Sequence, residues 1–106
     1  MKKSVSILAT LALVALVASP VARADQAAAQ KAGCLACHSV DKKLVGPAFK
    51  DVAAKYKGQA DAVAKLTDKV RKGGAGVWGQ IPMPPNPEAK INDAELKTVV
   101  EWILKG

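Results

Sequence analysis

Apolar residues recur at helical spacing in two stretches of the chain. Val63, Leu66 and Val70 lie at i, i+3 and i+7, and this spacing predicts a helix that begins near residue 60 and ends at Lys72. A second apolar stripe, at i, i+3, i+4 and i+7, predicts an amphipathic helix near the end of the chain. The members of that stripe are Leu96, Val99, Val100 and Ile103.

Residues that are typical of helix ends mark the limits of the predicted helices and indicate two further helical segments. Asn92, with Glu three positions later, resembles a capping box and predicts the start of the last helix. Asp25 is suited to cap a short helix over residues 25–32. Pro47 is suited to the first position of a helix that ends near Tyr56. No segment alternates apolar and polar residues as a strand does, so the sequence predicts an all-α fold of about four short helices.

Residues 73–91 interrupt this helical pattern. Four prolines and four glycines exclude a regular element there. Disorder is one interpretation, but Val77, Trp78, Ile81 and Met83 are side chains that favour burial. A loop of this length in so small a domain is usually functional or disordered. We expect it to be functional.

The first residues have the organisation of a secretory signal peptide. Two lysines follow Met1, residues 4–22 carry no charge, and Ala22-Arg23-Ala24 has the form of a cleavage site. An uncleaved membrane anchor is the alternative, but the unbroken apolar run over residues 11–18 is shorter than the ~20 residues that a spanning helix needs. We expect cleavage after Ala24, which would leave a soluble periplasmic domain of residues 25–106.

Composition limits the domain to a small one. The 106 residues include 16 Lys and Arg against 9 Asp and Glu, a net charge of +7 that the expected cleavage lowers to +4. This length excludes a multidomain enzyme, and a core this small often needs a covalent or metal staple. Phe49, Tyr56 and Trp102 are expected in the core. The basic charge would suit a nucleic-acid or membrane surface, but export and the dispersal of the lysines argue against both.

Cys34-x-x-Cys37-His38 is the attachment signature of a c-type haem. Two thiols at this spacing can form thioethers with the two vinyl groups of one porphyrin, and the adjacent imidazole can bind the iron. Three alternatives are weaker. A structural zinc site needs about four ligands, a thioredoxin-like dithiol belongs in a βαβ context, and a plain disulfide would leave His38 unexplained.

The second axial ligand follows by elimination. His38 is the only histidine, and Met83 is the only methionine beyond the signal sequence. Prolines on both sides of Met83 stiffen its loop. A His/Met pair is usual in cytochromes c, raises the reduction potential and leaves no open iron position. We therefore expect an electron carrier and not an enzyme. A peroxidase or a gas sensor, the alternatives, would need an open iron site.

With these residues the chain resembles the short bacterial class I monohaem cytochromes c of the cytochrome c-551 group. The resemblance covers nearly all of residues 25–106 and implies the cytochrome c fold, with helices packed around one covalent haem whose edge is exposed. Besides the haem signature, the segments that carry it are Val45-Gly46-Pro47-Ala48, residues 50–55, Gly76-Val77-Trp78-Gly79, Ile81-Pro82-Met83-Pro84-Pro85-Asn86 and the last helix with Trp102.

The resemblance also implies roles for residues around the haem. The Pro47 carbonyl should accept a hydrogen bond from the His38 ring, and the Asn86 amide should donate to the Met83 sulfur. The Trp78 indole should donate to a haem propionate. A basic residue should meet a propionate as well, and the candidates are Lys69 and Arg71.

The same resemblance implies the kind of partner. A monomer would shuttle electrons between membrane oxidoreductases and a terminal reductase, such as nitrite reductase, or an oxidase. Docking is expected at the exposed haem edge, where a basic rim would attract acidic partner surfaces. The edge residues are Cys34, Leu44, Val45, Ile81, Pro82 and Pro84, and the rim residues are Lys31, Lys42, Lys43, Lys69 and Arg71. A purely solubilising role for the lysines is the alternative.

Overall fold

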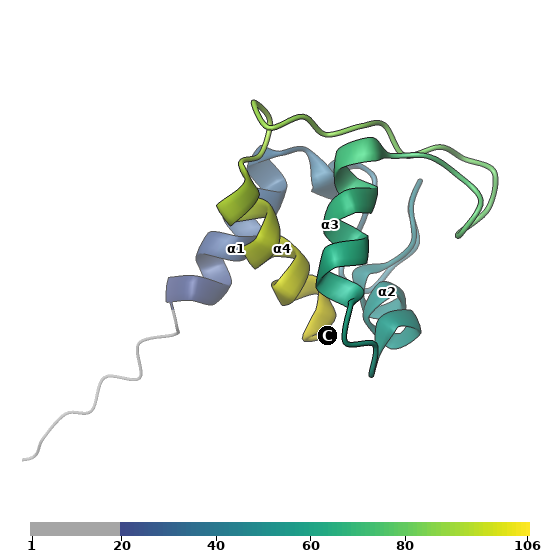
Figure 1. The fold of residues 1–106 in the computed structure, drawn as a ribbon, viewed down its shortest axis with the longest axis horizontal. Helices are drawn as coiled ribbons and strands as arrows, with labels where there is room; N and C mark the ends of the chain where they lie inside the picture. The colour runs from purple at the N-terminus through teal and green to yellow at the C-terminus, as the bar shows by residue number, and fades with distance from the viewer. Residues whose placement is uncertain (1–19) are drawn as a thin grey trace, which may run out of the picture.

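The computed structural model describes residues 20–106, and every regular element in that range is helical (Figure 1). The elements are α1 (Pro20–Lys31), the 3-10 turn η1 (Cys34–Ala36), α2 (Phe49–Tyr56), α3 (Ala62–Lys72) and α4 (Asp93–Leu104). Within this part of the chain no helix has the length and apolar character needed to cross a membrane. The predicted signal peptide lies mostly outside the described residues, which begin at Pro20.

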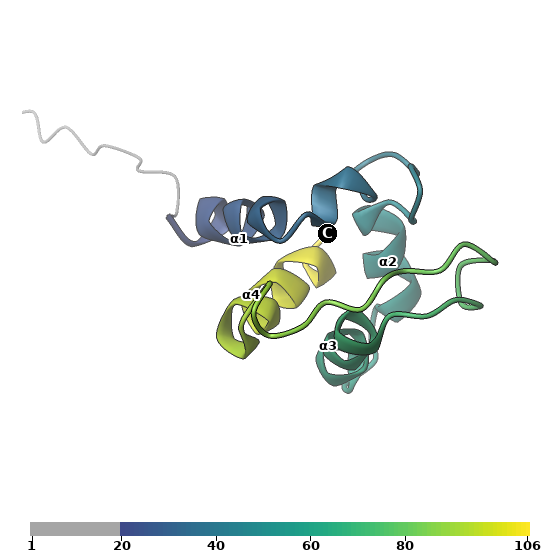
Figure 2. The same ribbon diagram turned by 90° about the horizontal axis from the view of Figure 1, so that it is seen from above.

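Helix α4 is the centre of the core, because it packs against α1, α2 and α3 (Figure 2). Leu96, Val99 and Val100 of its apolar stripe are buried, as the spacing predicted. Leu66 of α3 joins them, and the T-shaped contact between Phe49 and Trp102 connects α2 to α4. The all-α prediction is therefore confirmed.

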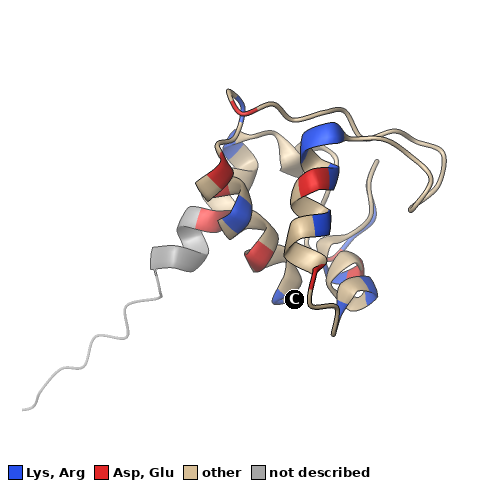
Figure 3. Ribbon diagram, viewed as in Figure 1, with Lys and Arg blue, Asp and Glu red and all other residues tan. Residues whose placement is uncertain are grey.

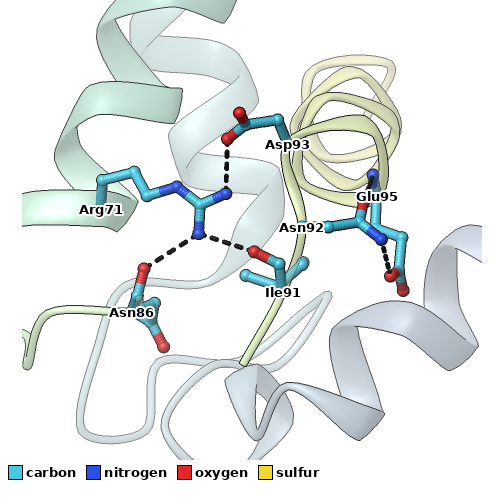
Figure 4. Close-up of polar contacts among 6 residues, drawn as sticks. All are labelled: Arg71, Asn86, Ile91, Asn92, Asp93 and Glu95. Atoms are coloured by element: carbon cyan, nitrogen blue, oxygen red, sulfur yellow. Dashed lines mark hydrogen bonds and ion pairs between the residues drawn. The ribbon is translucent and has the colours of Figure 1, made fainter. Parts of the chain in front are cut away.

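The helix starts differ from the predicted ones in two places. Helix α1 begins at Pro20, so Asp25 lies inside the helix and does not cap it. Helix α2 begins at Phe49, with Ala48 in the extended capping position, so Pro47 lies outside the helix. The capping box of α4 is present, since the Asn92 side chain accepts a hydrogen bond from the Glu95 amide at 2.8 Å. Figure 4 includes this cap.

Residues 73–91, here called the long loop, run from the end of α3 to the start of α4 (Figure 1). The loop is tied to itself where Gly74 and Met83 exchange two backbone hydrogen bonds, at 2.9 and 3.0 Å. Gly73 has a φ of +67°, and a side chain there would collide with the Met83 carbonyl. Glycine therefore permits both the turn out of α3 and the close return of the chain at Met83.

Candidate haem site

A cavity of about 270 Å³ opens between the helical core and the long loop. Its wall combines four parts of the chain: residues 34–52, the α3 side chains of residues 66–70, residues 74–84 of the long loop, and the buried face of α4. Among the predicted site residues, those that line the cavity are Cys34, Cys37, His38, Pro47, Lys69, Trp78 and Met83. Folding thus brings together groups that the sequence separates by up to half the chain.

The 3-10 turn η1 presents the two cysteines. Gly33 has a φ of +82° and ends α1, and the chain then turns so that the amides of Cys37 and His38 both donate to the Cys34 carbonyl, at 3.2 and 2.9 Å. The two cysteines are not joined to each other by a disulfide. Burial raises the pKa of the Cys34 thiol, and the positive charge of Lys90 opposes this shift. The two sulfurs are therefore available on one tight turn at the cavity wall.

The His38 ring is fixed by contacts with three neighbours. Its Nδ1 lies 2.8 Å from the Pro47 carbonyl oxygen, the contact that the resemblance implied. Because a carbonyl can only accept, Nδ1 carries the proton and Nε2 keeps its lone pair for a metal. Phe49 stacks with the ring at 5.2 Å, and a side chain at Gly46 would collide with it. The imidazole is thus prepared, in tautomer and orientation, to be an axial ligand.

The requirement for glycine at position 46 was missed by the sequence interpretation. Gly46 has an ordinary φ, so its importance comes from the closeness of the His38 ring and not from its backbone conformation. The Gly46 amide also donates to the Cys37 carbonyl at 2.7 Å. The Gly-Pro pair after the haem signature was the available signal, but only the folded chain shows that the glycine lies against the ring.

The long loop supplies apolar side chains that the protein itself does not cover. Val77, Trp78 and Ile81 are 51%, 41% and 65% exposed, and all three line the cavity with the partly buried Met83. Residues 73–87 carry no charge, and this part of the long loop is tan in Figure 3. Large apolar side chains on a cavity wall indicate a bound apolar group, and a porphyrin face is such a group.

The charges at the cavity are all positive. Among residues 20–106, Lys43 and Lys69 are the charged residues that line it, and no carboxylate from this part of the chain does so. A haem brings two propionates, so this charge distribution suits it. The Lys55 ammonium lies 5.6 Å from the centre of the Trp78 ring, which adds a cation–π contact beside the cavity. Lys43 was not predicted as a site residue.

Two predicted site residues do not reach the cavity. The Asn86 amide does not donate to the Met83 sulfur, because both of its hydrogens are used by the carbonyls of Val70 and Pro84, each at 3.2 Å. Arg71 does not face the cavity either. It lies two positions after Lys69, which turns it by ~200° around the helix, and its guanidinium contacts Asn86 and the start of α4 (Figure 4). In this structure neither side chain makes the contact that the resemblance implied.

Comparison with known proteins agrees with this site. A family model for cytochrome c matches residues 22–106. The chain belongs to the cytochrome c family. A cytochrome c-551 of Allochromatium vinosum is 53% identical over 89% of this chain and 98% of its own length, and a cytochrome c-552 of Nitrosomonas europaea is 50% identical over 92% of each. The crystal structure of the Nitrosomonas europaea cytochrome c552 superposes with a TM-score of 0.70 at 51% identity, covering 74% of this chain and 95% of the other.

These likenesses place this cytochrome c in the class I monohaem c-551 group, whose members are electron-transfer proteins and not enzymes. The protein carries one covalently bound haem c, for which Cys34 and Cys37 are the available thioether positions. The apolar lining and the positive charges of the cavity fit that group. Zinc does not fit, because nowhere in residues 20–106 do three His, Cys, Asp or Glu side chains gather as metal ligands would.

Proposed function

We propose that this cytochrome c is a periplasmic one-electron carrier whose haem iron is bound by His38 and Met83. A bound haem supplies the redox chemistry, its iron alternating between the ferric and ferrous states. The observation that carries the proposal is the His38–Pro47 contact at 2.8 Å, which leaves Nε2 as the free imidazole nitrogen on a cavity wall that also contains Met83. Neutral imidazole and thioether together favour ferrous iron and close the coordination sphere.

The remaining polar groups of the cavity are proposed to hold the propionates. Lys69 and Lys43 line the cavity and provide positive charge, and the Trp78 indole nitrogen has no hydrogen bond to the protein in the described residues. An indole N–H beside a cavity favours an acceptor. Lys69 is therefore the preferred cation for a propionate in place of Arg71. The Trp78 indole is the proposed uncharged donor to a propionate.

The proposed docking surface is the apolar edge of the cavity. Leu44, Val45 and Ile81 are half or more exposed. Lys42 and Lys43 precede this patch in sequence and are exposed as well. An apolar centre with a basic rim suits a brief contact with an acidic redox partner, such as a membrane oxidoreductase, a nitrite reductase or an oxidase.

Export is part of the proposal. The basic start, uncharged residues 4–22 and the Ala22-Arg23-Ala24 site support cleavage after Ala24 and a periplasmic location. Purification from the periplasmic fraction, followed by N-terminal sequencing, tests this directly. A product that begins at Asp25 and is heavier than its polypeptide by one haem is the expected result. A membrane-bound product that keeps residues 1–24 would contradict it.

Optical spectroscopy of the holoprotein tests the axial ligands. The ferric protein should be low-spin and show the weak sulfur-to-iron charge-transfer band of methionine ligation, and the ferrous protein should not bind carbon monoxide. A high-spin ferric spectrum, or rapid carbon monoxide binding by the unaltered protein, would support an open iron site and overturn the carrier proposal.

A further inference from the structure

Arg71 connects three segments that are separate in the sequence (Figure 4). From the last turn of α3, its Nη1 donates to the Asn86 carbonyl at 3.1 Å and to the Ile91 carbonyl at 2.6 Å. Its Nη2 forms an ion pair with the Asp93 carboxylate at 2.7 Å. The side chain of Arg71 is only 20% exposed, whereas that of Asp93 is 80% exposed. The two carbonyl contacts are thus the sheltered part of this network.

Asn86 is held by Val70 and Arg71 at the end of α3 and by Pro84 of its own loop. Its backbone amide donates to the Val70 carbonyl at 3.1 Å, its side-chain amide donates to Val70 and Pro84, and its own carbonyl accepts from Arg71. The residue is 4% exposed. Asn86 therefore anchors the chain three residues beyond Met83, and Arg71 is the only side chain described here that donates to its carbonyl.

The segment between Met83 and Asn86 depends on anchors at its two ends. Met83 is paired with Gly74 through backbone bonds, and Asn86 is fixed to Val70 and Arg71. The two residues between, Pro84 and Pro85, have no backbone N–H and limit rotation of the chain. A stiff segment transmits the position of its anchors, so release of Asn86 displaces Met83 more than it would in a flexible loop.

We propose that Arg71 is a positioning residue for the Met83 sulfur: its guanidinium locks the Met83–Asn86 segment against α3 and the start of α4. This inference rests on the proposed His38/Met83 ligation. Hydrogen bonds in which one partner is charged are stronger than those between neutral groups. Loss of the two sheltered contacts should therefore raise the population in which Met83 has left the iron by roughly tenfold or more.

The test compares Arg71→Met with Lys72→Met in the holoprotein. Both variants remove one positive charge from the same turn of α3, but Lys72 is exposed and pairs only with Asp68 of its own helix. Carbon monoxide binding to the ferrous protein reports departure of Met83, and far-UV circular dichroism in guanidinium reports global unfolding. Arg71→Met should bind carbon monoxide at least ~10-fold faster and lose the sulfur–iron band before the helices unfold. Lys72→Met should behave like the unaltered protein.

Two milder variants grade the effect and keep the test informative if Arg71→Met fails to fold. Asp93→Asn removes only the exposed ion pair and should leave carbon monoxide binding within about threefold of normal. Arg71→Lys keeps the charge but loses the planar guanidinium, which reaches the two carbonyls through Nη1 and Asp93 through Nη2, so an intermediate increase is expected.

The possible results distinguish a failure of the Arg71 inference from a failure of the proposed His38/Met83 ligation. If the sulfur–iron band of the Arg71 variants disappears only together with the helices, and carbon monoxide binding does not accelerate, Arg71 has a purely structural role and the inference is overturned. If the unaltered protein itself shows no sulfur–iron band, the Met83 ligation is wrong and the inference falls with it.

Discussion

The face of α4 and the long loop contain the same kinds of side chain in opposite environments. Val99 on α4 is 2% exposed, whereas Val77 in the long loop is 51% exposed. The α4 side chains form one wall of the cavity and are also buried against three other helices, whereas the loop side chains beside the cavity stay exposed. The polypeptide alone therefore buries the α4 side chains, whereas the apolar side chains of the long loop need the haem for their burial.

The helices and the long loop therefore contribute to the stability of this small domain in different ways. The helices pack against one another through local caps and apolar stripes. The loop holds its shape through few contacts, chiefly at Gly74, Met83 and Asn86, and its apolar residues gain stability only against a bound group. Substitutions in the two regions should therefore fail in different ways.

The largest expected effect comes from removal of the haem attachment. Cys34→Ala combined with Cys37→Ala should abolish covalent retention and leave a mostly unfolded chain, because the loop and one side of the core lose their partner. Acidic acetone extraction and far-UV circular dichroism measure the two results. Ser39→Ala, a neutral change beside the same motif, is the control. A haem-free double variant with a cooperative thermal transition would show that the helices suffice on their own.

Leu96→Ala tests the polypeptide half. Leu96 is 1% exposed in the core, so truncation should lower the free energy of unfolding by about 2–5 kcal/mol. The matched change Leu44→Ala, at a side chain that is 50% exposed, should cost within about 0.5 kcal/mol. Guanidinium titrations of both holoproteins provide the measurement. Equal costs at the two positions would contradict the division between core and exposed edge.

Met83→Ala tests the haem-dependent half. Replacement of the thioether by water should lower the reduction potential by about 100 mV or more, which is about 2.3 kcal/mol for one electron. Potentiometric titration and carbon monoxide binding measure the change, and Val40→Ala, an exposed apolar position that does not line the cavity, is the control. Survival of the sulfur–iron band in Met83→Ala would exclude Met83 as the ligand.

The smallest effects are expected at the docking edge. Charge reversal at Lys42 and Lys43 should slow association with an acidic redox partner several-fold at low salt, and the difference should shrink as ionic strength rises from ~10 to ~200 mM. Val45→Lys should slow transfer largely independently of salt, because it disturbs the apolar patch. Stopped-flow kinetics separate the two. A reaction indifferent to both changes would restrict the lysines to a solubilising role.

Prediction from sequence succeeded where the signal is local. The i, i+3, i+7 stripes placed α3 and α4, and the Cys34–His38 motif identified the haem. The start of α2 was misplaced because the Pro47 carbonyl serves His38 instead of a helix. The two cations could not be separated by sequence, since only the rotation of α3 directs Lys69 to the cavity and Arg71 to α4.

The requirement for glycine at position 46 and the partners of the Asn86 amide both come from contacts that only the folded chain shows. Gly46 is required by a ring eight residues earlier, and the amide of Asn86 is used by carbonyls of α3 and of its own loop. Such contacts between distant segments leave no periodic pattern in the sequence. Family resemblance can suggest them, but only the folded geometry decides which partner each polar group takes.

The contact between α1 and α4 has a kinetic consequence. These helices come from the two ends of the described chain, so the core forms only after a long closure, whose entropic cost grows with the logarithm of the loop length. A haem fixed to Cys34 and Cys37 offers an apolar surface on which the middle of the chain can pack. The loop between α1 and α4 is then closed in several shorter steps. We therefore expect the haem-bearing chain to fold much faster than its haem-free counterpart.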